Sequence, residues 1–516
     1  MGFTTVAEFD QAYQSVHKAF ATGTTRNKEW RRHQLKRTWW MVEENKERIA
    51  DALYADLHRH RQESYISDCS VVQNDILNTL KKLDEWTKDE KPSRWDPVNF
   101  LGGTVVRMEP KGVVLIIGAW NFPITLSLQP LVAAIAAGCA LILKPSDLVP
   151  AVQDLLIELI PQYLDHDAIR CVSAGGQEMP YILEQRYDHI FYTGSARIGK
   201  VVHAAAAKHL TPTTLELGGL APAIVTPAAN IDLSAKRIAS VKFTNAGQIC
   251  VSINHILVDP IVKEALISNL IRYFDIFTEG KKQPEYSTHI VNERSFDRLD
   301  NLLRQTSGQI LYGGHRDRST RFFGPTIVSV KPDDILLSEE LFGPILPIVE
   351  ADLTTAIALI NGSDRPLAIY PFTDLEAEKQ RVLNETRSGG LTFNDGILQT
   401  LAMDSPFGGT GSSGHGAYHG PYGVREFSHL RTFCNGFPTW MELIMNARYP
   451  PYTLKKARML APQIKPPFDR DGKDVGMSSW TKVALGTGAL ALSIAVLRDG
   501  EQVSALSSRV LKQVGL

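Results

Sequence analysis

Short apolar strands alternate with helical segments between about residues 112 and 219, and this alternation constrains the fold more than any other feature of the chain. The strand-like runs are "CALILKPS", "AIRCVSAG", "HIFYTGS" and "PTTLELGG", and the segments between them include "LSLQPLVAAIAAG", "AVQDLLIELI" and "IGKVVHAAAAK". Strands that are apolar throughout and separated by helices are typical of a parallel sheet covered on both faces. We therefore predict a doubly wound α/β sheet, a fold that binds nucleotides at the carboxyl ends of its strands.

A second alternating section runs from near residue 220 to about residue 394, with strands such as "HILVD", "QILYGG", "PILPIVEA" and "GGLTFND". Single cores stop growing at about 250–300 residues, so a chain of 516 residues needs two or three domains. We expect a second α/β domain here. Before the first sheet, apolar residues recur at steps of three and four between about residues 9 and 95, which predicts covering helices.

Two β-rich runs, "TVVRMEP" and "GVVLIIGAW", are separated only by Pro110, Lys111 and Gly112. Proline and glycine between two such runs favour a turn. We predict a β-hairpin over about residues 103–112 that leads into a core strand.

The composition excludes several classes of function. The formal net charge is −1, with 44% hydrophobic and 22% charged residues, which gives no electrostatic reason to expect nucleic acid as a partner. The chain has five cysteines, an odd number without a C-x-x-C pair, and no histidine cluster has metal-ligand spacing. We expect reduced thiols in a cytosolic setting and predict no metal site.

One apolar segment near the end of the chain, "WTKVALGTGALALSIAVL" at residues 480–497, departs from this soluble composition. Its uncharged part, 483–497, is shorter than the ~20 residues that cross a bilayer. Trp480 suits the membrane interface and Lys482 can extend toward it, which lengthens the effective span. We expect a membrane helix, and a buried core helix packed through Gly486 and Gly488 is the alternative.

The candidate functional residues are weak signals when they are taken singly. A lone cysteine such as Cys250, in "FTNAGQIC", is more often a small core residue than a nucleophile. Asn121 before Phe122-Pro123 can simply form a turn, Glu216 can be a solvated residue at a strand end, and Lys144 can be a surface lysine.

Taken together and in order, the motifs resemble those of the aldehyde dehydrogenase superfamily over nearly all of residues 9–432. They are "WNFP" at 120–123, "KPS" from 144, "YTGS" from 192, "ELGG" from 216, "NAGQIC" at 245–250 and "EELFGP" at 339–344. The later segments "FGGTGSSGHGAYHG", "FSH" and "RYPPY", with the apolar tail, look like the class 3, fatty aldehyde dehydrogenase branch.

The resemblance implies a role for three residues. It makes Cys250 the nucleophile, and a thiolate adduct is what allows an aldehyde to give up hydride. Asn121 resembles the residue whose amide donates to the oxyanion, together with the Cys250 backbone N–H. Glu216 matches the general base that activates the hydrolytic water, which also argues against the coenzyme-A-acylating relatives that generally lack this base.

The resemblance also implies an NAD cofactor, with NADP possible. Gly194 and Ser195 open a helix whose free N–H groups suit a pyrophosphate, although the spacing to Gly199 is not the generic G-x-G-x-x-G. Lys144 looks like the residue that contacts the adenine-side ribose. Glu340 and Phe342 resemble the residues that hold the nicotinamide ribose. The resemblance also implies a cofactor contact for Trp120.

Some positions depart from the common family pattern. Asp147 follows "KPS" where Glu is frequent, and Leu220 stands where Lys often follows "ELGG". These two leave the choice between NAD and NADP open, since a ribose hydroxyl and a phosphate need different partners. Asn254 and His255 follow the nucleophile where many members have other residues, so the identity of the substrate does not carry over.

The sequence thus predicts an aldehyde dehydrogenase fold, with a Rossmann-like cofactor domain, a second α/β catalytic domain and a bridging or oligomerisation hairpin. The expected boundaries are 1–217 for the cofactor domain, 218–400 for the catalytic domain, 401–435 for a Gly-rich loop and bridging segment, 436–478 for an arm, 479–498 for the membrane helix and 499–516 for a tail.

We expect oxidation of a long-chain apolar aldehyde, and two alternatives remain open. The first is an apocarotenoid aldehyde as the substrate, since fungal members of this branch look similar. The second is an inactive scaffold or binding protein on the same fold. We also expect a homodimer, held to a membrane by the C-terminal helix, at the endoplasmic reticulum, with the catalytic body in the cytosol.

Overall fold

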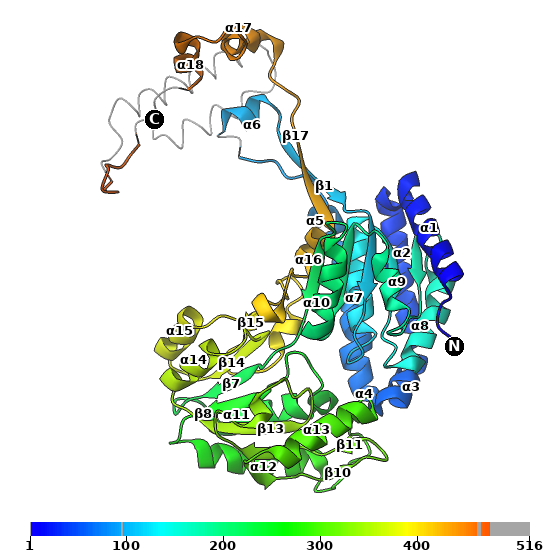
Figure 1. The fold of residues 1–516 in the computed structure, drawn as a ribbon, viewed down its shortest axis with the longest axis vertical. Helices are drawn as coiled ribbons and strands as arrows, with labels where there is room; N and C mark the ends of the chain where they lie inside the picture. Colours follow the sequence, from blue (N-terminus) through cyan, green and yellow to red (C-terminus); the bar gives the residue numbers. More distant parts are fainter. Residues whose placement is uncertain (1, 94–95, 462–465, 475–516) are drawn as a thin grey trace. The chain divides into compact units, whose positions relative to one another are not determined.

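The computed structural model describes residues 2–93, 96–461 and 466–474 (Figure 1). These residues fall into a main compact unit within residues 1–100 and 104–434 and a smaller one within residues 101–103 and 435–516. The main unit holds both large sheets and the six family motifs from "WNFP" to "EELFGP".

The first sheet has six strands in the order β16-β6-β5-β2-β3-β4. Five of its strands are parallel, and the edge strand β16 runs antiparallel to β6. The strands are β2 (Val113–Ile117), β3 (Ala140–Lys144), β4 (Ile169–Cys171), β5 (His189–Thr193), β6 (Thr213–Glu216) and β16 (Gly414–His415). This arrangement confirms the predicted doubly wound sheet, and it places a topological switch point between β2 and β5.

Helices join these strands and cover the sheet. The connecting helices are α7 (Thr125–Ala137), α8 (Pro150–Tyr163), α9 (Met179–Glu184) and α10 (Ala196–Ala207). The predicted N-terminal helices are α1 (Val6–Thr22), α2 (Lys28–Glu44), α3 (Lys46–Leu57), α4 (Arg61–Ser64) and α5 (Val71–Trp86). A π-helical turn, Tyr65–Ser70, separates α4 from α5.

The second sheet has seven strands in the order β15-β14-β7-β8-β13-β12-β9 and lies below the first in Figure 1. It is parallel except for the edge strand β9. Its strands are β7 (Pro222–Val225), β8 (His255–Val258), β9 (Gln309–Tyr312), β12 (Thr326–Ser329), β13 (Ile345–Glu350), β14 (Ala368–Phe372) and β15 (Gly390–Leu391). Its helices are α11 (Ile231–Phe243), α12 (Lys263–Thr278), α13 (Glu293–Gln305), α14 (Leu353–Asn361) and α15 (Glu376–Glu385). A short ribbon pairs β10 (Arg316–Asp317) with β11 (Phe322–Phe323).

The predicted hairpin over residues 103–112 is wrong. The strand β1 (Val105–Pro110), which follows α6 (Pro97–Leu101), pairs antiparallel with β17 (Ser428–Phe433), and β17 follows α16 (Gly420–Glu426). The reason is that β2 lies between β3 and β5, so neither of its edges is free for β1. Pro110 to Gly112 link two sheets instead of turning within one. The Val113 N–H, at the start of β2, donates to Asp188 at 2.8 Å.

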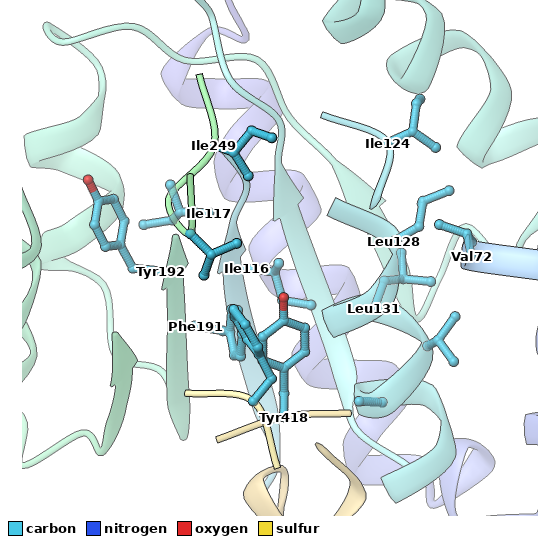
Figure 2. Close-up of a cluster of buried hydrophobic side chains, with 14 of the residues drawn as sticks. Val72, Ile116, Ile117, Ile124, Leu128, Leu131, Phe191, Tyr192, Ile249 and Tyr418 are labelled. Atoms are coloured by element: carbon cyan, nitrogen blue, oxygen red, sulfur yellow. The ribbon is translucent and has the colours of Figure 1, made fainter. Parts of the chain in front are cut away.

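The largest core cluster joins the first sheet to its covering helices. Figure 2 shows side chains from β2, β5 and α7 packed together with Val72 of α5 and with Tyr418. Ile249, the residue before Cys250, belongs to the same cluster and is 6% exposed. The core of the first sheet therefore extends to the segment that carries the candidate nucleophile.

The smaller unit contains the helices α17 (Glu442–Met445) and α18 (Leu454–Leu460). Within the described part of the chain, no helix combines the length and the apolar character that a membrane span requires. The predicted membrane helix at residues 480–497 lies outside the described residues.

Candidate active site

The loop that carries Cys250 has an unusual backbone. It follows α11, and three consecutive residues, Asn245, Ala246 and Gly247, have φ values of 50°, 52° and 70°. A left-handed conformation costs a non-glycine residue about 1–2 kcal/mol, so surrounding contacts must hold this segment. A Cβ on Gly247 would stand 2.4 Å from the Gly343 carbonyl oxygen, which shows how closely the loop packs against the "EELFGP" segment.

Hydrogen bonds of the buried Gln248 side chain anchor this loop to residues 289–291. Its amide nitrogen donates to the carbonyls of Asn245 at 3.1 Å and His289 at 3.0 Å. Its amide oxygen accepts from the Val291 N–H at 3.0 Å. The Tyr370 hydroxyl of β14 donates to the Val251 carbonyl at 2.6 Å, so the backbone is fixed on both sides of Cys250.

The Cys250 thiol is partly buried, and its surroundings disfavour the thiolate. Burial, together with the smaller effect of the charges of Glu340 and Glu216, raises the pKa of Cys250 to about 12, while the N–H groups of Cys250 and Val251 oppose the shift. The sequence left open how the thiol is activated. The structure shows two backbone donors that favour the thiolate and two carboxyls that oppose it while they are ionised.

Asn121 lies directly beside the Cys250 loop. It follows β2 and is 3% exposed, and its side-chain amide donates to the Gln248 carbonyl at 3.2 Å. An amide nitrogen carries two N–H groups, so a second donor is available for a substrate oxygen. The structure therefore brings the Asn121 side chain and the Cys250 loop together.

Glu216 ends β6 and is buried, with 3% of its surface exposed. Neither of its carboxyl oxygens has a hydrogen-bond partner among the described residues. Burial raises the pKa of Glu216 well above its ordinary value, and the charge of Glu426 adds to the shift. A buried, unpaired carboxyl that also interacts electrostatically with Cys250 is typical of a catalytic acid or base.

The residues implied for cofactor binding lie at the carboxyl ends of the parallel strands. Trp120 follows β2, Lys144 ends β3, and Gly194 and Ser195 follow β5. Lys144 is 5% exposed and forms an ion pair with Asp147 at 2.8 Å. Ser195 caps α10 by accepting from the Ile198 N–H at 3.5 Å. These positions surround the switch point, where such sheets bind their ligands.

Gly199 lies in the first turn of α10. A Cβ on Gly199 would stand 2.9 Å from a methyl carbon of Leu217. The absence of a side chain therefore brings the helix close to the segment after β6, as in dinucleotide-binding turns.

The "EELFGP" segment approaches this edge from the second sheet. Burial raises the pKa of Glu340 to about 8, while a hydrogen bond from the Gly219 N–H and the charge of Arg298 oppose the shift. Phe342 has a φ of 48°, and its ring lies 5.2 Å from the Trp120 ring, centroid to centroid. Glu340 and Phe342 therefore meet the first-sheet residues at one site.

The sequence did not single out three further residues of the site. Arg59 is fully buried and donates to the Asn121 carbonyl, burial lowers the pKa of Lys242 to about 7, and Tyr418 interacts electrostatically with Glu216 and Cys250. Arg59 and Lys242 lie in segments with an ordinary helical or loop pattern, and Tyr418 lies in the Gly-rich stretch "FGGTGSSGHGAYHG". Only the fold brings them to the site.

The carboxyl edge of a doubly wound sheet, joined to a thiol, an amide donor and a buried carboxyl, fits a cysteine-dependent dehydrogenase. Comparison with known proteins identifies its family. Residues 3–433 match the model of the aldehyde dehydrogenase family, and the chain belongs to this family. It is an NAD(P)-dependent aldehyde dehydrogenase.

Two curated relatives and one solved structure show the extent of the similarity. The dimeric NADP-preferring aldehyde dehydrogenase of Rattus norvegicus is 40% identical over 456 residues, which cover 88% of this chain and 100% of the relative. The beta-apo-4'-carotenal oxygenase of Neurospora crassa is 40% identical over 485 residues, 92% of this chain and 90% of its own. The substrate-bound Staphylococcus aureus AldH matches with a TM-score of 0.81 and 36% identity over 84% of this chain and 94% of its own. These relatives confirm the resemblance to the class 3 and fungal branch.

Proposed function

We propose that this enzyme oxidises a long-chain apolar aldehyde to its carboxylic acid, with Cys250 as the nucleophile, Asn121 as the oxyanion donor and Glu216 as the base of the hydrolytic step. The observation that carries this assignment is the buried carboxyl of Glu216, which has no hydrogen-bond partner among the described residues and interacts electrostatically with Cys250. An unpaired buried carboxyl is costly, so a function must retain it.

The residues perform two successive steps. The Cys250 thiol loses its proton to solvent, its sulfur bonds to the aldehyde carbon, and the carbonyl oxygen becomes an oxyanion that accepts from the Asn121 amide and the Cys250 N–H. Loss of hydride from that carbon leaves a thioester. Glu216, in the ionised form that burial disfavours, then removes a proton from water as the water oxygen attacks the thioester carbon. The C–S bond breaks to release the carboxylic acid, and the proton on Glu216 passes to the Cys250 thiolate and regenerates the thiol.

The site residues fit a nicotinamide dinucleotide. When it is bound, this cofactor supplies the hydride acceptor. Ser195 and the free N–H groups of α10 suit its pyrophosphate, the buried Lys144 suits a ribose hydroxyl, and Glu340 and Phe342 suit the second ribose. We propose NAD as the main cofactor because the Asp147 carboxylate, which holds Lys144 at 2.8 Å, opposes a 2′-phosphate. The rat relative is named NADP-preferring, so NADP is the alternative. Steady-state rates with each cofactor decide between them.

The aldehyde class is proposed from the apolar C-terminal segment and from the fungal relative. A long apolar aldehyde partitions into lipid, so an enzyme at a membrane meets it where it is concentrated. An apocarotenoid aldehyde is the second candidate, because the Neurospora crassa relative is named for one. Specificity constants for aldehydes of increasing chain length, measured beside an apocarotenal, test both. If short polar aldehydes are preferred, the proposal fails.

We propose further that residues 480–497 anchor the enzyme to the cytosolic face of the endoplasmic reticulum. Supporting features lie in the arm before this segment. The helix α18 carries Lys455, Lys456 and Arg458 without an acidic residue, and Leu454 and Tyr452 are 78% and 81% exposed. Cations beside exposed apolar groups suit an anionic leaflet. Deletion after Gly476 should release the enzyme from membranes with its activity intact. A truncated protein that still sediments with membranes would defeat the proposal.

A silent scaffold is the remaining alternative, and the complete set of Cys250, Asn121 and Glu216 argues against it. A burst of reduced nicotinamide on mixing with an aldehyde separates the two functions. Cys250→Ala should abolish the burst and leave cofactor affinity within a few-fold, because the thiol acts on the aldehyde and not on the dinucleotide.

A further inference from the structure

Arg59 is a fully buried cation with no assigned role. It lies between α3 and α4, and its side chain is 0% exposed. Its guanidinium forms an ion pair with the equally buried Asp68 at 2.6 Å, and its charged carbon lies 4.8 Å from the centre of the Phe122 ring. Burial of a charge is expensive unless it is paired and hydrogen-bonded, so the position of each partner is informative.

One nitrogen of Arg59 donates hydrogen bonds to both segments that form the proposed oxyanion site, the Asn121 segment and the Cys250 loop. Its Nη2 atom donates to the backbone carbonyl of Asn121 and to the side-chain oxygen of Asn245, the latter at 2.5 Å. The Asn245 amide in turn donates to the Asn121 carbonyl at 3.0 Å and to the Gln248 carbonyl at 2.9 Å. Because Asn121 also donates to Gln248, these groups form a closed network around the base of the Cys250 loop.

The two carboxyls beside Arg59, those of Asp68 and Glu63, accept hydrogen bonds from the same two segments. Asp68 lies in the π-helical turn and accepts from the N–H groups of Ile124 and Thr125, each at 3.2 Å, where the Asn121 segment enters α7. Glu63 lies 4.0 Å from Arg59 and accepts from the Asn245 N–H at 2.7 Å, in the left-handed part of the Cys250 loop. Arg59 with its two acids therefore links the segment after β2 to the segment after α11.

We propose that Arg59 is a positioning residue that sets the direction of the Asn121 amide relative to the Cys250 sulfur and so controls formation of the oxyanion adduct. This inference rests on the proposed roles of Asn121 and Cys250. A planar guanidinium donates to several acceptors in a fixed geometry, and an ammonium group does not reproduce that pattern. Displacement of a catalytic group by about 1 Å costs on the order of 10²-fold in rate.

A double-mutant cycle between Arg59→Lys and Asn121→Ala tests the inference in the full-length enzyme. The readout is the rate of hydride transfer in a single turnover, with cofactor affinity and unfolding measured beside it. We expect Arg59→Lys to slow hydride transfer about 10- to 100-fold with cofactor affinity within a few-fold. Asn121→Ala should cost about 10²–10³-fold, and the double variant should be no slower than Asn121→Ala alone.

Arg31→Lys is the matched control. Arg31 is 6% exposed and donates to the carbonyls of Thr25, Ala136 and Arg26 at 3.0–3.1 Å, away from the site. The Arg31→Lys enzyme should be less stable but should transfer hydride at the unchanged rate. If Arg59→Lys does not fold, Asn245→Gly keeps the positive φ, removes the acceptor of Arg59 and should show the same non-additivity.

Two results would overturn the inference. If the losses in hydride-transfer rate of Arg59→Lys and Asn121→Ala multiply in the double variant, Arg59 acts independently of Asn121. An Arg59→Lys enzyme that behaves like Arg31→Lys would show a purely structural role. Failure of the proposed function is distinct, because it would appear as a Cys250→Ala enzyme that retains its turnover.

Discussion

At the residue scale, we expect the reactivity of Cys250 to depend on the protonation of Glu340. Burial and nearby carboxylate charge raise the pKa of Cys250 to about 12, and Glu340 itself has a pKa of about 8. Glu340 is therefore mostly neutral at pH 6.5 and charged at pH 9. We predict that Glu340→Gln speeds alkylation of Cys250 at pH 9 and leaves the rate unchanged at pH 6.5, in enzyme without cofactor.

Mass spectrometry of the Cys250 peptide after timed alkylation measures this rate, in a Cys434→Ser background that removes an exposed thiol. Equal acceleration at both pH values would contradict the electrostatic explanation, because a neutral Glu340 exerts no charge.

The raised pKa of Glu216 has a consequence for stability. A carboxyl whose pKa is higher in the folded state than its unfolded value of 4.5 keeps its proton after the unfolded chain has lost it. Folding stability therefore falls as the pH rises above about 4.5, with a slope of up to about 1.4 kcal/mol per pH unit from this group. We predict that Glu216→Gln flattens this slope and raises the free energy of unfolding at neutral pH. Urea unfolding between pH 4.5 and 7.5 is the measurement, and parallel curves for the two enzymes would be inconsistent with a buried, protonated Glu216.

The candidate site residues could be named from the sequence because Cys250, Glu216 and Asn121 each lie in a short local motif. Distant partners such as Tyr370 nevertheless hold the Cys250 loop in place. Arg59 and Lys242 could not be predicted, because their significance depends on partners far away in the chain. Arg59 meets Asn245 across 186 positions. No local pattern records such a contact.

At the element scale, the Cys250 loop depends on a close backbone contact at Gly247. Gly247 and Gly280 have φ values of 70° and 68°, but a Cβ on Gly280 meets nothing within 4 Å, whereas one on Gly247 meets a carbonyl oxygen at 2.4 Å. We predict that Gly280→Ala costs only about 1–2 kcal/mol of stability and no activity. Gly247→Ala should cost more stability and about 10²-fold in turnover, because the loop must move. Equal effects of the two substitutions on turnover would show that the contact with Gly343 is unimportant.

The strands of both sheets could be predicted from their apolar runs, but the pairing of β1 could not. Its sequence neighbour β2 has both edges occupied, and its actual partner β17 lies more than 300 positions later, Val105 opposite Phe433. Pairing over such a separation follows from the closure of the whole fold. The predicted strand "GGLTFND" is likewise shorter in the structure, where β15 spans only Gly390–Leu391, although the N–H groups of Thr392 and Asn394 also donate to β14 carbonyls.

At the scale of the whole molecule, the proposed homodimer has a free strand edge available. Within the described residues, β17 pairs only with β1. The N–H and carbonyl of Val106 in β1 bond to Glu90 and therefore point away from β17. In an antiparallel pair the facing residue does the same, so the N–H and carbonyl of Thr432 point away from β1. Because the direction alternates along a strand, the N–H and carbonyl of Leu430 also point away from β1. Proline at an outward-facing position removes a donor without breaking the β1–β17 ladder.

We therefore predict that Leu430→Pro shifts the enzyme from dimer to monomer, while Leu430→Ala does not. Sedimentation velocity in detergent measures the mass of each. A wild-type monomer or stable tetramer would refute the proposed dimer, and a Leu430→Pro protein that stays dimeric would exclude this edge as the interface.

The central claim is that Cys250 forms a thioester whose hydrolysis needs Glu216. The most direct test is the mass of the Cys250 peptide after Glu216→Gln enzyme is mixed with NAD and a long-chain aldehyde and quenched in acid. The account predicts a burst of reduced nicotinamide close to one equivalent per site, followed by a stall, with the acyl group on Cys250. An enzyme that turns over normally, or a burst that leaves Cys250 unmodified, would contradict it.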